Sequence, residues 1–322
     1  MKYTTKYILK LVLPLLLGVF LVWYSLSQIS IETLVGYFKK ADYTYIILGM
    51  FFGLLSHLSR AYRWLFQLEP LGYKIKLGNS IMAVLANYLI NYTIPRAGEV
   101  ARASIITNYE GVPFEKAFGT IVAERIADLI MMFFIILVTL FMQFDFIYGF
   151  LMDRFNPLKL VIIALIGVLG LLIIFRYIKT SKSKLAVKLK GFVNGLIEGA
   201  LSVFKMKKKW PFIFHTLFIW AMYVLMFYVT SFALPRTAEI PFSALLIGFI
   251  AGSFSIAATN GGIGSYPEAI VLAFSLFSIP ADPSRAFGWI MWSAQTILII
   301  IFGGLSLISL PIFNRKKWST PS

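Results

Sequence analysis

Apolar residues form long blocks along the chain, separated by short polar stretches. Several blocks exceed the ~18 nearly uncharged residues that a helix needs to cross a bilayer. Such blocks predict an all-α polytopic membrane protein, folded as one membrane domain over residues 1–322. The predicted apolar segments are Tyr7–Leu26, Tyr43–Ser59, Leu77–Ile94, Phe114–Met142, Leu158–Tyr177, Pro211–Ala233, Phe242–Ala258, Glu268–Ile279 and Arg285–Leu310.

Two of these blocks are broken, and a shorter apolar run follows each break. The first break carries Pro95-Arg96-Ala97-Gly98-Glu99 and the second Asn260-Gly261-Gly262-Ile263-Gly264-Ser265. Further on, Lys116-Ala117-Phe118-Gly119 and Arg285-Ala286-Phe287-Gly288 each open a long apolar helix. Interrupted segments at matching places in two halves are typical of transporters with inverted repeats, and they mark the substrate site.

The symmetry predicts a first repeat half at 43–179, a connector at 180–209 and a second half at 210–312. The connector carries apolar residues at helical spacing between lysines over Lys182–Lys209. This pattern indicates either an amphipathic helix on the inner leaflet or a soluble connector of ordinary amphipathicity.

Basic residues indicate the topology, because Lys and Arg concentrate in cytoplasmic loops. Residues 176–209 hold ten Lys and Arg against one acid, Glu198, and both termini are also basic. With these segments on the cytoplasmic side, the stretch 77–112 must begin and end on that side. Residues 99–109 are too short to cross the membrane on the way back, because a helix of this length reaches only about 16 Å. We therefore predict six full spans and two re-entrant helical hairpins that enter from opposite faces. Eight complete spans are the alternative.

Composition supports this class: 59% of residues are apolar, 14% are charged, and the mean hydropathy is +0.81. Cysteine is absent, and only two histidines occur, His57 and His215, so no metal site or cofactor is expected. The net charge of +16 fits nucleic acid or anionic lipid. On a membrane protein it indicates basic loops that face lipid, so membrane lipids are the expected partner and nucleic acid is not.

Charged residues at the first break are candidates for substrate binding. Arg96, Glu99 and Arg102 follow one another at spacing three, and Glu99 and Arg102 can share a helix face. A charge near the bilayer centre costs roughly 3 kcal/mol, so such residues face protein or water and mark function. The alternative is that they lie near the interface, snorkelling or paired for structure.

A second charged group lies on the helix that follows. Glu124 is about 16 Å from a helix start at the inner face, and Asp128 is one turn later on the same face. Arg125 can pair with Asp128 within the helix, which leaves one carboxylate for Arg96 or Arg102. That carboxylate is alternatively protonated and couples transport to protons, because desolvation raises the pKa of an acid. A purely structural ion-pair cluster remains open.

The second break predicts a helix start that can hold a phosphate. Ser265 is the expected cap, Pro267 lies in the first turn, and Glu268 follows three residues after the serine. Free N–H groups at a helix start attract anions, and Gly261, Gly262 and Gly264 let the backbone approach a ligand. Asn260 precedes them. Glu268 either caps its own helix or binds a cationic head group.

The remaining polar and aromatic residues in the apolar segments are expected to be structural. Asn87 and Asn91 are predicted to hold the first hairpin together. Gln295 is expected to have the same role. His57, Arg60 and Arg63 are expected to snorkel at the inner interface. Interfacial anchors are expected at Trp23, Trp64, Trp210 and Trp318.

Three motifs resemble one known family. They are Pro95-Arg96-Ala97-Gly98-Glu99-Val100-Ala101-Arg102, then Glu110-Gly111-Val112, then Ala123-Glu124-Arg125-Ile126-Ala127-Asp128-Leu129. Together they resemble the flippase-like integral membrane proteins, which include the membrane region of lysyl-phosphatidylglycerol synthases. The second glycine motif, with Glu268, is similar to that of the family, and the resemblance covers about residues 10–312. Pro95 and Arg96 are adjacent where the family often spaces them, and Asn260 stands where proline is common.

The resemblance implies translocation of a phospholipid or a lipid-linked head group between leaflets, in the cytoplasmic membrane. The chain ends soon after the last helix, so lipid aminoacylation by a soluble domain is not expected, and we expect no enzyme activity. A homo-oligomer or a separate lipid-synthesising enzyme is an expected partner. The alternatives are a membrane-embedded transferase with Glu124 as base and a non-transporting scaffold for envelope biosynthesis.

Overall fold

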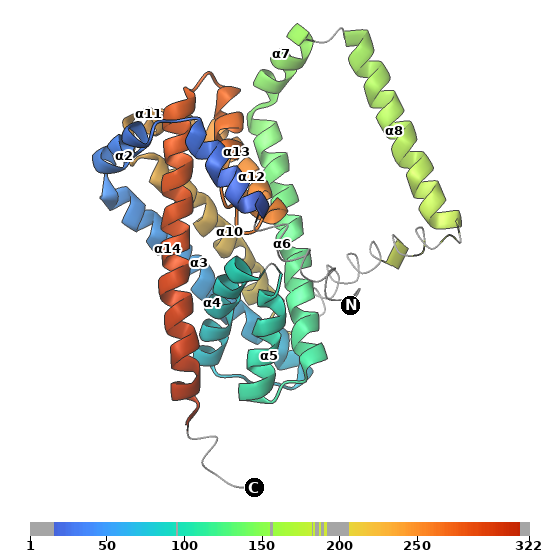
Figure 1. Ribbon diagram of the computed structural model, residues 1–322. Helices are drawn as coiled ribbons and strands as arrows, with labels where there is room; N and C mark the ends of the chain where they lie inside the picture. The colour runs from blue at the N-terminus through green and yellow to red at the C-terminus, as the bar shows by residue number, and fades with distance from the viewer. Residues whose placement is uncertain are drawn as a thin grey trace, which may run out of the picture. The chain divides into compact units, whose positions relative to one another are not determined.

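The computed structural model describes residues 16–94, 96–154, 157–181, 183, 187, 190–191 and 206–315. Within these residues the secondary structure is helical, as predicted, and contains no strand. A helical segment at Leu16–Ser27 comes first. The elements that follow are α2 (Ile31–Lys40), α3 (Tyr43–Leu68), η1 (Glu69–Leu71), α4 (Leu77–Thr93), α5 (Gly98–Glu110), α6 (Phe114–Met142), α7 (Phe144–Arg154), α8 (Pro157–Thr180), α10 (Lys209–Ser231), α11 (Pro235–Ala238), α12 (Phe242–Ala258), α13 (Ser265–Ser275) and α14 (Ala281–Phe313) (Figure 1).

Three described helices are long and apolar enough to cross a membrane: α6, α10 and α14. The segment Leu16–Ser27 and α2 pass the same test as a pair, although they are bent by 84° at their junction. The chain is therefore a multi-pass membrane protein. The count of six spans stays a prediction, because length and composition alone identify these helices.

The chain divides into two compact units. One comprises residues up to Val122 together with those from Trp210 onward, and the other comprises Ala123–Lys209. The first unit contains both broken helix pairs, α4–α5 and α12–α13. The predicted repeat halves, 43–179 and 210–312, rest on similar motifs in the sequence, whereas the two units are defined by how compactly they pack. The repeat halves therefore stay a prediction.

Most helix bounds agree with the hydropathy pattern, and α6 and α12 have the predicted ends. The main difference is α3, which continues nine residues beyond Ser59 to Leu68. Hydropathy stops at Ser59 because Arg60, Arg63 and Gln67 follow, but these side chains are buried within the fold. The predicted connector helix over 182–209 lies almost entirely outside the described residues.

Helices α2 and α7 were not predicted. The helix α2 is amphipathic and contributes no buried residue, so hydropathy averaged over a longer window misses it. Ser30 caps it by accepting a hydrogen bond from the backbone N–H of Thr33, and Lys39 and Lys40 lie in its last turn. Both features stabilise a helix end.

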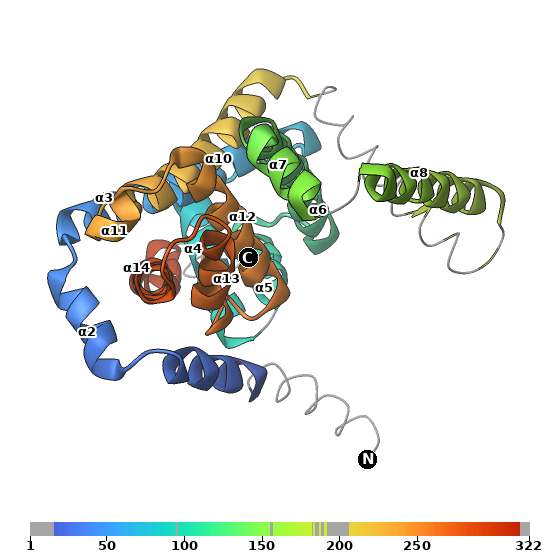
Figure 2. The same cartoon turned by 90° about the horizontal axis from the view of Figure 1, so that it is seen from above.

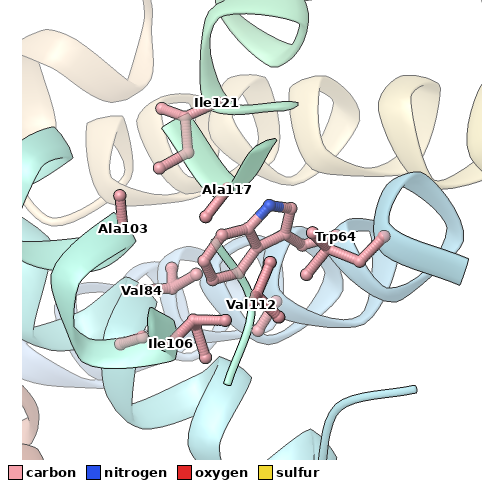
Figure 3. Packing of buried hydrophobic residues seen from close by; sticks show 10 residues of the cluster. Trp64, Val84, Ala103, Ile106, Val112, Ala117 and Ile121 are labelled. Atoms are coloured by element: carbon pink, nitrogen blue, oxygen red, sulfur yellow. The ribbon is translucent and has the colours of Figure 1, made fainter. Parts of the chain in front are cut away.

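In the first unit, α14 packs against α4, α13 and α3 (Figure 2). Figure 3 shows the apolar core where α3, α4, α5 and the start of α6 meet around Trp64. Small side chains let these helices approach one another, because Ala61, Ala83, Ala103 and Ala117 are all fully buried. This core fixes the α4–α5 pair and so positions the first break.

Candidate functional site

The first break lies between α4 and α5, which pack against each other. The helix α4 ends at Thr93, and Ile94 is extended, as the residue before a proline tends to be. Arg96 adopts a left-handed backbone with φ of 62°, and it is exposed. A non-glycine residue in this region costs roughly 1–2 kcal/mol, so the neighbouring contacts must hold the bend.

Asn91 supplies one of those contacts. Its Oδ1 accepts a 2.8 Å hydrogen bond from the backbone N–H of Gly98, and its Nδ2 lies 3.4 Å from Glu99 Oε2. A Cβ at position 98 would collide with the carbonyl oxygen of Asn87, so only glycine fits there. The predicted structural role of Asn91 in the hairpin is confirmed.

The second break lies between α12 and α13. Gly261, Gly262 and Gly264 have φ of 66°, 77° and 68°, a backbone that glycine adopts readily. Gly264 is the N-cap of α13, and Ser265 is its first helical residue. The predicted serine cap is therefore wrong: the Ser265 hydroxyl lies 2.7 Å from that of Ser255 and 2.9 Å from that of Thr259. It ties the two helices of the pair together instead.

The two breaks touch each other. The Asn260 side chain donates a 2.9 Å hydrogen bond from Nδ2 to the carbonyl oxygen of Tyr92, the penultimate residue of α4. The Tyr92 ring lies against Gly261, and its hydroxyl accepts a 3.3 Å hydrogen bond from Thr296 of α14. Trp292 of α14 donates to the carbonyl of Gly261 at 2.9 Å. The ends of two hairpins far apart in sequence thus meet beside α14.

Glu268 forms a two-contact ion pair with Arg285 on α14. The guanidinium donates from Nε to Oε1 at 2.7 Å and from Nη2 to Oε2 at 3.0 Å. Ser25 donates a third hydrogen bond to Oε1 at 2.6 Å and itself accepts one from the indole N–H of Trp289. Neither predicted role of Glu268 accounts for these contacts, because the carboxylate is bonded to a neighbouring helix.

The two similar tetrads differ in what their basic residues do. Arg285 is buried in the ion pair, whereas Lys116 is exposed and lies over the ring of Tyr73. The alanines that follow, Ala117 and Ala286, are both fully buried. The shared pattern therefore reflects how the first turns of two long helices pack against the fold. The basic residue of each tetrad makes different contacts.

Buried guanidinium groups gather on α3 and α5. Arg60 and Arg63 are 2% and 0% exposed, and Arg63 donates a 2.7 Å hydrogen bond to Thr216 Oγ1 of α10. Arg102 is fully buried with its Cζ 3.9 Å from the ring centre of Trp64, a close cation–π contact. The prediction that Arg60 and Arg63 snorkel to the interface is wrong, because protein side chains surround them.

Trp64 is likewise a core residue rather than an interfacial anchor. It is fully buried in the apolar core (Figure 3). Its indole N–H donates a 2.7 Å hydrogen bond to Thr120 Oγ1. Trp23 and Trp210 are 64% and 72% exposed, as interfacial anchors would be. Trp318 lies outside the described residues.

The carboxylate group of α6 belongs to the second unit. Glu124 is fully buried, and Arg125 Nη2 lies 3.3 Å from its Oε1. Arg125 Nη1 also lies 3.6 Å from Asp128 Oδ2, which confirms the predicted pairing within the helix. No group of three or more His, Asp or Glu side chains within the described part of the chain is placed to hold a metal ion.

Three of the predicted groups thus keep their local arrangement. Arg96 and Glu99 flank the first break, Asn260 to Ser265 form the second, and Glu124 to Asp128 lie together on α6. Sequence reasoning missed Arg285 as the partner of Glu268. A signal existed, because a short loop joins α13 to α14, so residues near this loop on the two helices can meet.

Comparison with known proteins places the chain in a family. The model of the family described as the lysylphosphatidylglycerol synthase TM region matches residues 11–303. The UPF0104 membrane protein MJ1595 of Methanocaldococcus jannaschii is 26% identical over 327 residues, which cover 91% of this chain and 92% of the relative. No solved structure matches. The chain belongs to the family of the lysylphosphatidylglycerol synthase TM region.

Proposed function

We propose that this protein moves a phospholipid or a lipid-linked head group between the leaflets of the cell membrane. The contact between the two broken helix pairs, where Asn260 bonds to the Tyr92 carbonyl, is the observation that supports it most strongly. Because the break between α4 and α5 lies beside the break between α12 and α13, irregular backbone from both helix pairs is gathered at one place. In transporters, substrate sites form where discontinuous helices meet in this way.

In the proposed topology, α4–α5 and α12–α13 are re-entrant hairpins that enter from opposite faces, with six full spans around them and both termini in the cytoplasm. Irregular backbone within a membrane is tolerated only where protein buries it or where it lines a cavity. The hydrogen bonds of Asn91, Asn260 and Trp292 satisfy this backbone at the two breaks. Polar atoms there would line a cavity for the head group while the acyl chains stay in lipid.

Two features near the breaks would bind the anionic part of a head group. Arg96, exposed at the first break, would attract the phosphate. The start of α13 at Gly264, which carries the positive end of the helix dipole, would provide a second site for an anion. Glu99, in the first turn of α5, would balance this positive charge. Glu268 and Arg285 hold the second hairpin, and Arg102 packs under Trp64 to hold the first.

We expect that no bond in the lipid is made or broken. The two alternatives differ in what purified protein does in vesicles. A transferase would change the mass of a lipid when supplied with donor, whereas a scaffold would leave both lipid mass and lipid position unchanged. Movement of unmodified labelled lipid by the protein, above the rate in protein-free vesicles, supports translocation. Its absence in well-folded protein contradicts translocation.

Replacing Arg96 by glycine separates the charge of this residue from its backbone role. Glycine adopts the left-handed conformation without strain, so the melting temperature should stay equal or rise slightly. Loss of a charge-assisted contact with phosphate should slow lipid movement about tenfold. Arg96→Lys, which retains the positive charge, is the control and should keep most of the rate. Wild-type rates in Arg96→Gly would exclude Arg96 from phosphate binding.

A further inference from the structure

A polar and aromatic cluster lies in the first unit, away from the charged motifs. The His57 ring of α3 lies 4.4 Å from the ring of Tyr88 on α4 and 6.1 Å from that of Tyr223 on α10, centre to centre. The hydroxyls of Tyr88 and Tyr223 are 3.3 Å apart. Trp220, one turn before Tyr223, contacts it edge-on at 6.1 Å. Three helices thus direct hydrogen-bonding side chains to one place.

Two atoms of this cluster are buried without a hydrogen-bond partner among the residues that the structure describes: Nδ1 of His57 and Nε1 of Trp220. The two residues are only 8% and 7% exposed. An unsatisfied buried polar group costs roughly 1–3 kcal/mol, so native proteins seldom keep one without a ligand or water to bond it. Tyr88 and Tyr223 are partly exposed, so the cluster is not completely enclosed by the fold.

The geometry points to a binding site for the hydroxyl groups of a hydroxyl-rich head group without a positive charge, at His57, Tyr88, Trp220 and Tyr223. This inference rests on the proposed lipid translocation and names the class of its substrate. A hydroxyl both donates and accepts, so it can bond an imidazole nitrogen in either tautomer and also accept from an indole N–H. The aromatic rings offer flat apolar faces to the carbon skeleton of a polyol.

The charge nearby argues against a cationic head group. Arg60 lies one turn along α3 from His57, and its guanidinium is buried within the fold. A like charge such as an ammonium group would be repelled there. Glycerol and sugar head groups carry the required hydroxyls without a positive charge.

The helix α4 connects this cluster to the place where the two breaks meet. Tyr88 and Tyr92 are four residues apart and therefore share a face of α4. Tyr92 contacts the second break through Asn260 and Gly261. A head group bound at the cluster is thus one helical turn from the proposed crossing point.

The test compares three labelled lipids in phosphatidylcholine vesicles that contain the full-length protein. The lipids are phosphatidylglycerol, a monoglucosyl diacylglycerol and phosphatidylethanolamine. We expect at least one of the two hydroxyl-rich lipids to move about ten times faster than phosphatidylethanolamine. Preference for the glucosyl lipid would identify sugar hydroxyls as the source, and preference for phosphatidylglycerol would identify glycerol beside a phosphate. Equal rates for all three lipids would overturn the inference.

The variant Tyr88→Phe/Tyr223→Phe removes two hydroxyls and keeps both rings, so the helix packing should survive. It should lose the tenfold preference, because the hydroxyl-rich lipid then moves no faster than phosphatidylethanolamine. Tyr62→Phe on the exposed side of α3 is the matched control and should keep the preference. A preference that persists in the double variant would also contradict the inference.

A binding measurement separates this inference from the proposed function. Native mass spectrometry of the purified protein should show retention of the preferred hydroxyl-rich lipid over phosphatidylethanolamine, and the double variant should lose it. If wild type moves no lipid but shows this selectivity, translocation fails and the binding site stands. If it moves lipid without selectivity in either measurement, the binding site fails and translocation stands.

Discussion

Replacing Glu268 by alanine should destabilise the protein by about 3 kcal/mol, because it leaves a buried guanidinium without its carboxylate. Arg285 is only 5% exposed in its side chain and makes two short contacts to Glu268. The same substitution removes the acceptor of Ser25, which bonds the segment Leu16–Ser27 to α13. The melting temperature in detergent, followed by loss of the monodisperse peak in size-exclusion chromatography, measures the effect.

Asp282→Ala is the matched control, since it removes a different carboxylate near the same arginine. Asp282 lies 3.8 Å from Arg285 Nη1, and its side chain is 52% exposed. A pair of this kind contributes roughly 0–1 kcal/mol, so the melting temperature should change little. Equal stability of the Glu268→Ala and Asp282→Ala variants would show that the ion pair does not hold the second hairpin.

Gly98→Ala should separate α4 from α5 and destabilise the protein by about 3 kcal/mol. The added Cβ would meet the Asn87 carbonyl and approach Asn91 Cγ to 2.7 Å. The first of these neighbours is backbone, which cannot rotate away, so the helices must shift at an overpacking cost of about 1–3 kcal/mol. The shift also breaks the Gly98 N–H bond to Asn91, whose loss adds about 1 kcal/mol.

Gly119→Ala on α6 provides the comparison for that substitution. Gly119 is exposed, has no heavy atom within 4 Å of the added Cβ, and lies inside a helix. Alanine there should stabilise the helix by up to about 1 kcal/mol. Thermal unfolding of both variants should therefore shift in opposite directions. A Gly98→Ala protein as stable as wild type would contradict the close approach of α4 and α5.

Local patterns in the sequence were enough to predict most of the described helices, apart from α2 and α7, and the two breaks. Apolar runs set the ends of α6 and α12, and proline and glycine marked where α4 and α12 stop. The role of Asn91 also followed from its spacing near the break. These features depend on residues a few positions apart, which a single sequence displays directly.

Features that depend on long-range contacts could not be predicted in the same way. The sequence indicated an interfacial position for Arg60 and Arg63, because a hydropathy value takes no account of the residues around a charged side chain. In the fold, Arg63 donates a hydrogen bond to Thr216 of α10. Trp64 was predicted to be an interfacial anchor because its contact with Arg102 on another helix is not visible in the local sequence. The contact of Asn260 with Tyr92 joins residues 168 positions apart, which no local pattern reveals.

The central claim is that the head group crosses where the two hairpin ends meet, and a reversible cross-link tests it most directly. The chain has no cysteine, so thiols introduced by Tyr92→Cys and Asn260→Cys are the sole targets of a short reducible bis-thiosulfonate linker. A control pair, Ser275→Cys with Ala281→Cys, links the two ends of one short loop. Lipid movement is measured in vesicles before and after reduction.

We predict that linking residues 92 and 260 lowers lipid movement to the rate of protein-free vesicles, and that reduction restores it. The control pair should transport equally well in both states. A protein that moves lipid at the same rate with residues 92 and 260 linked as after reduction would contradict the account.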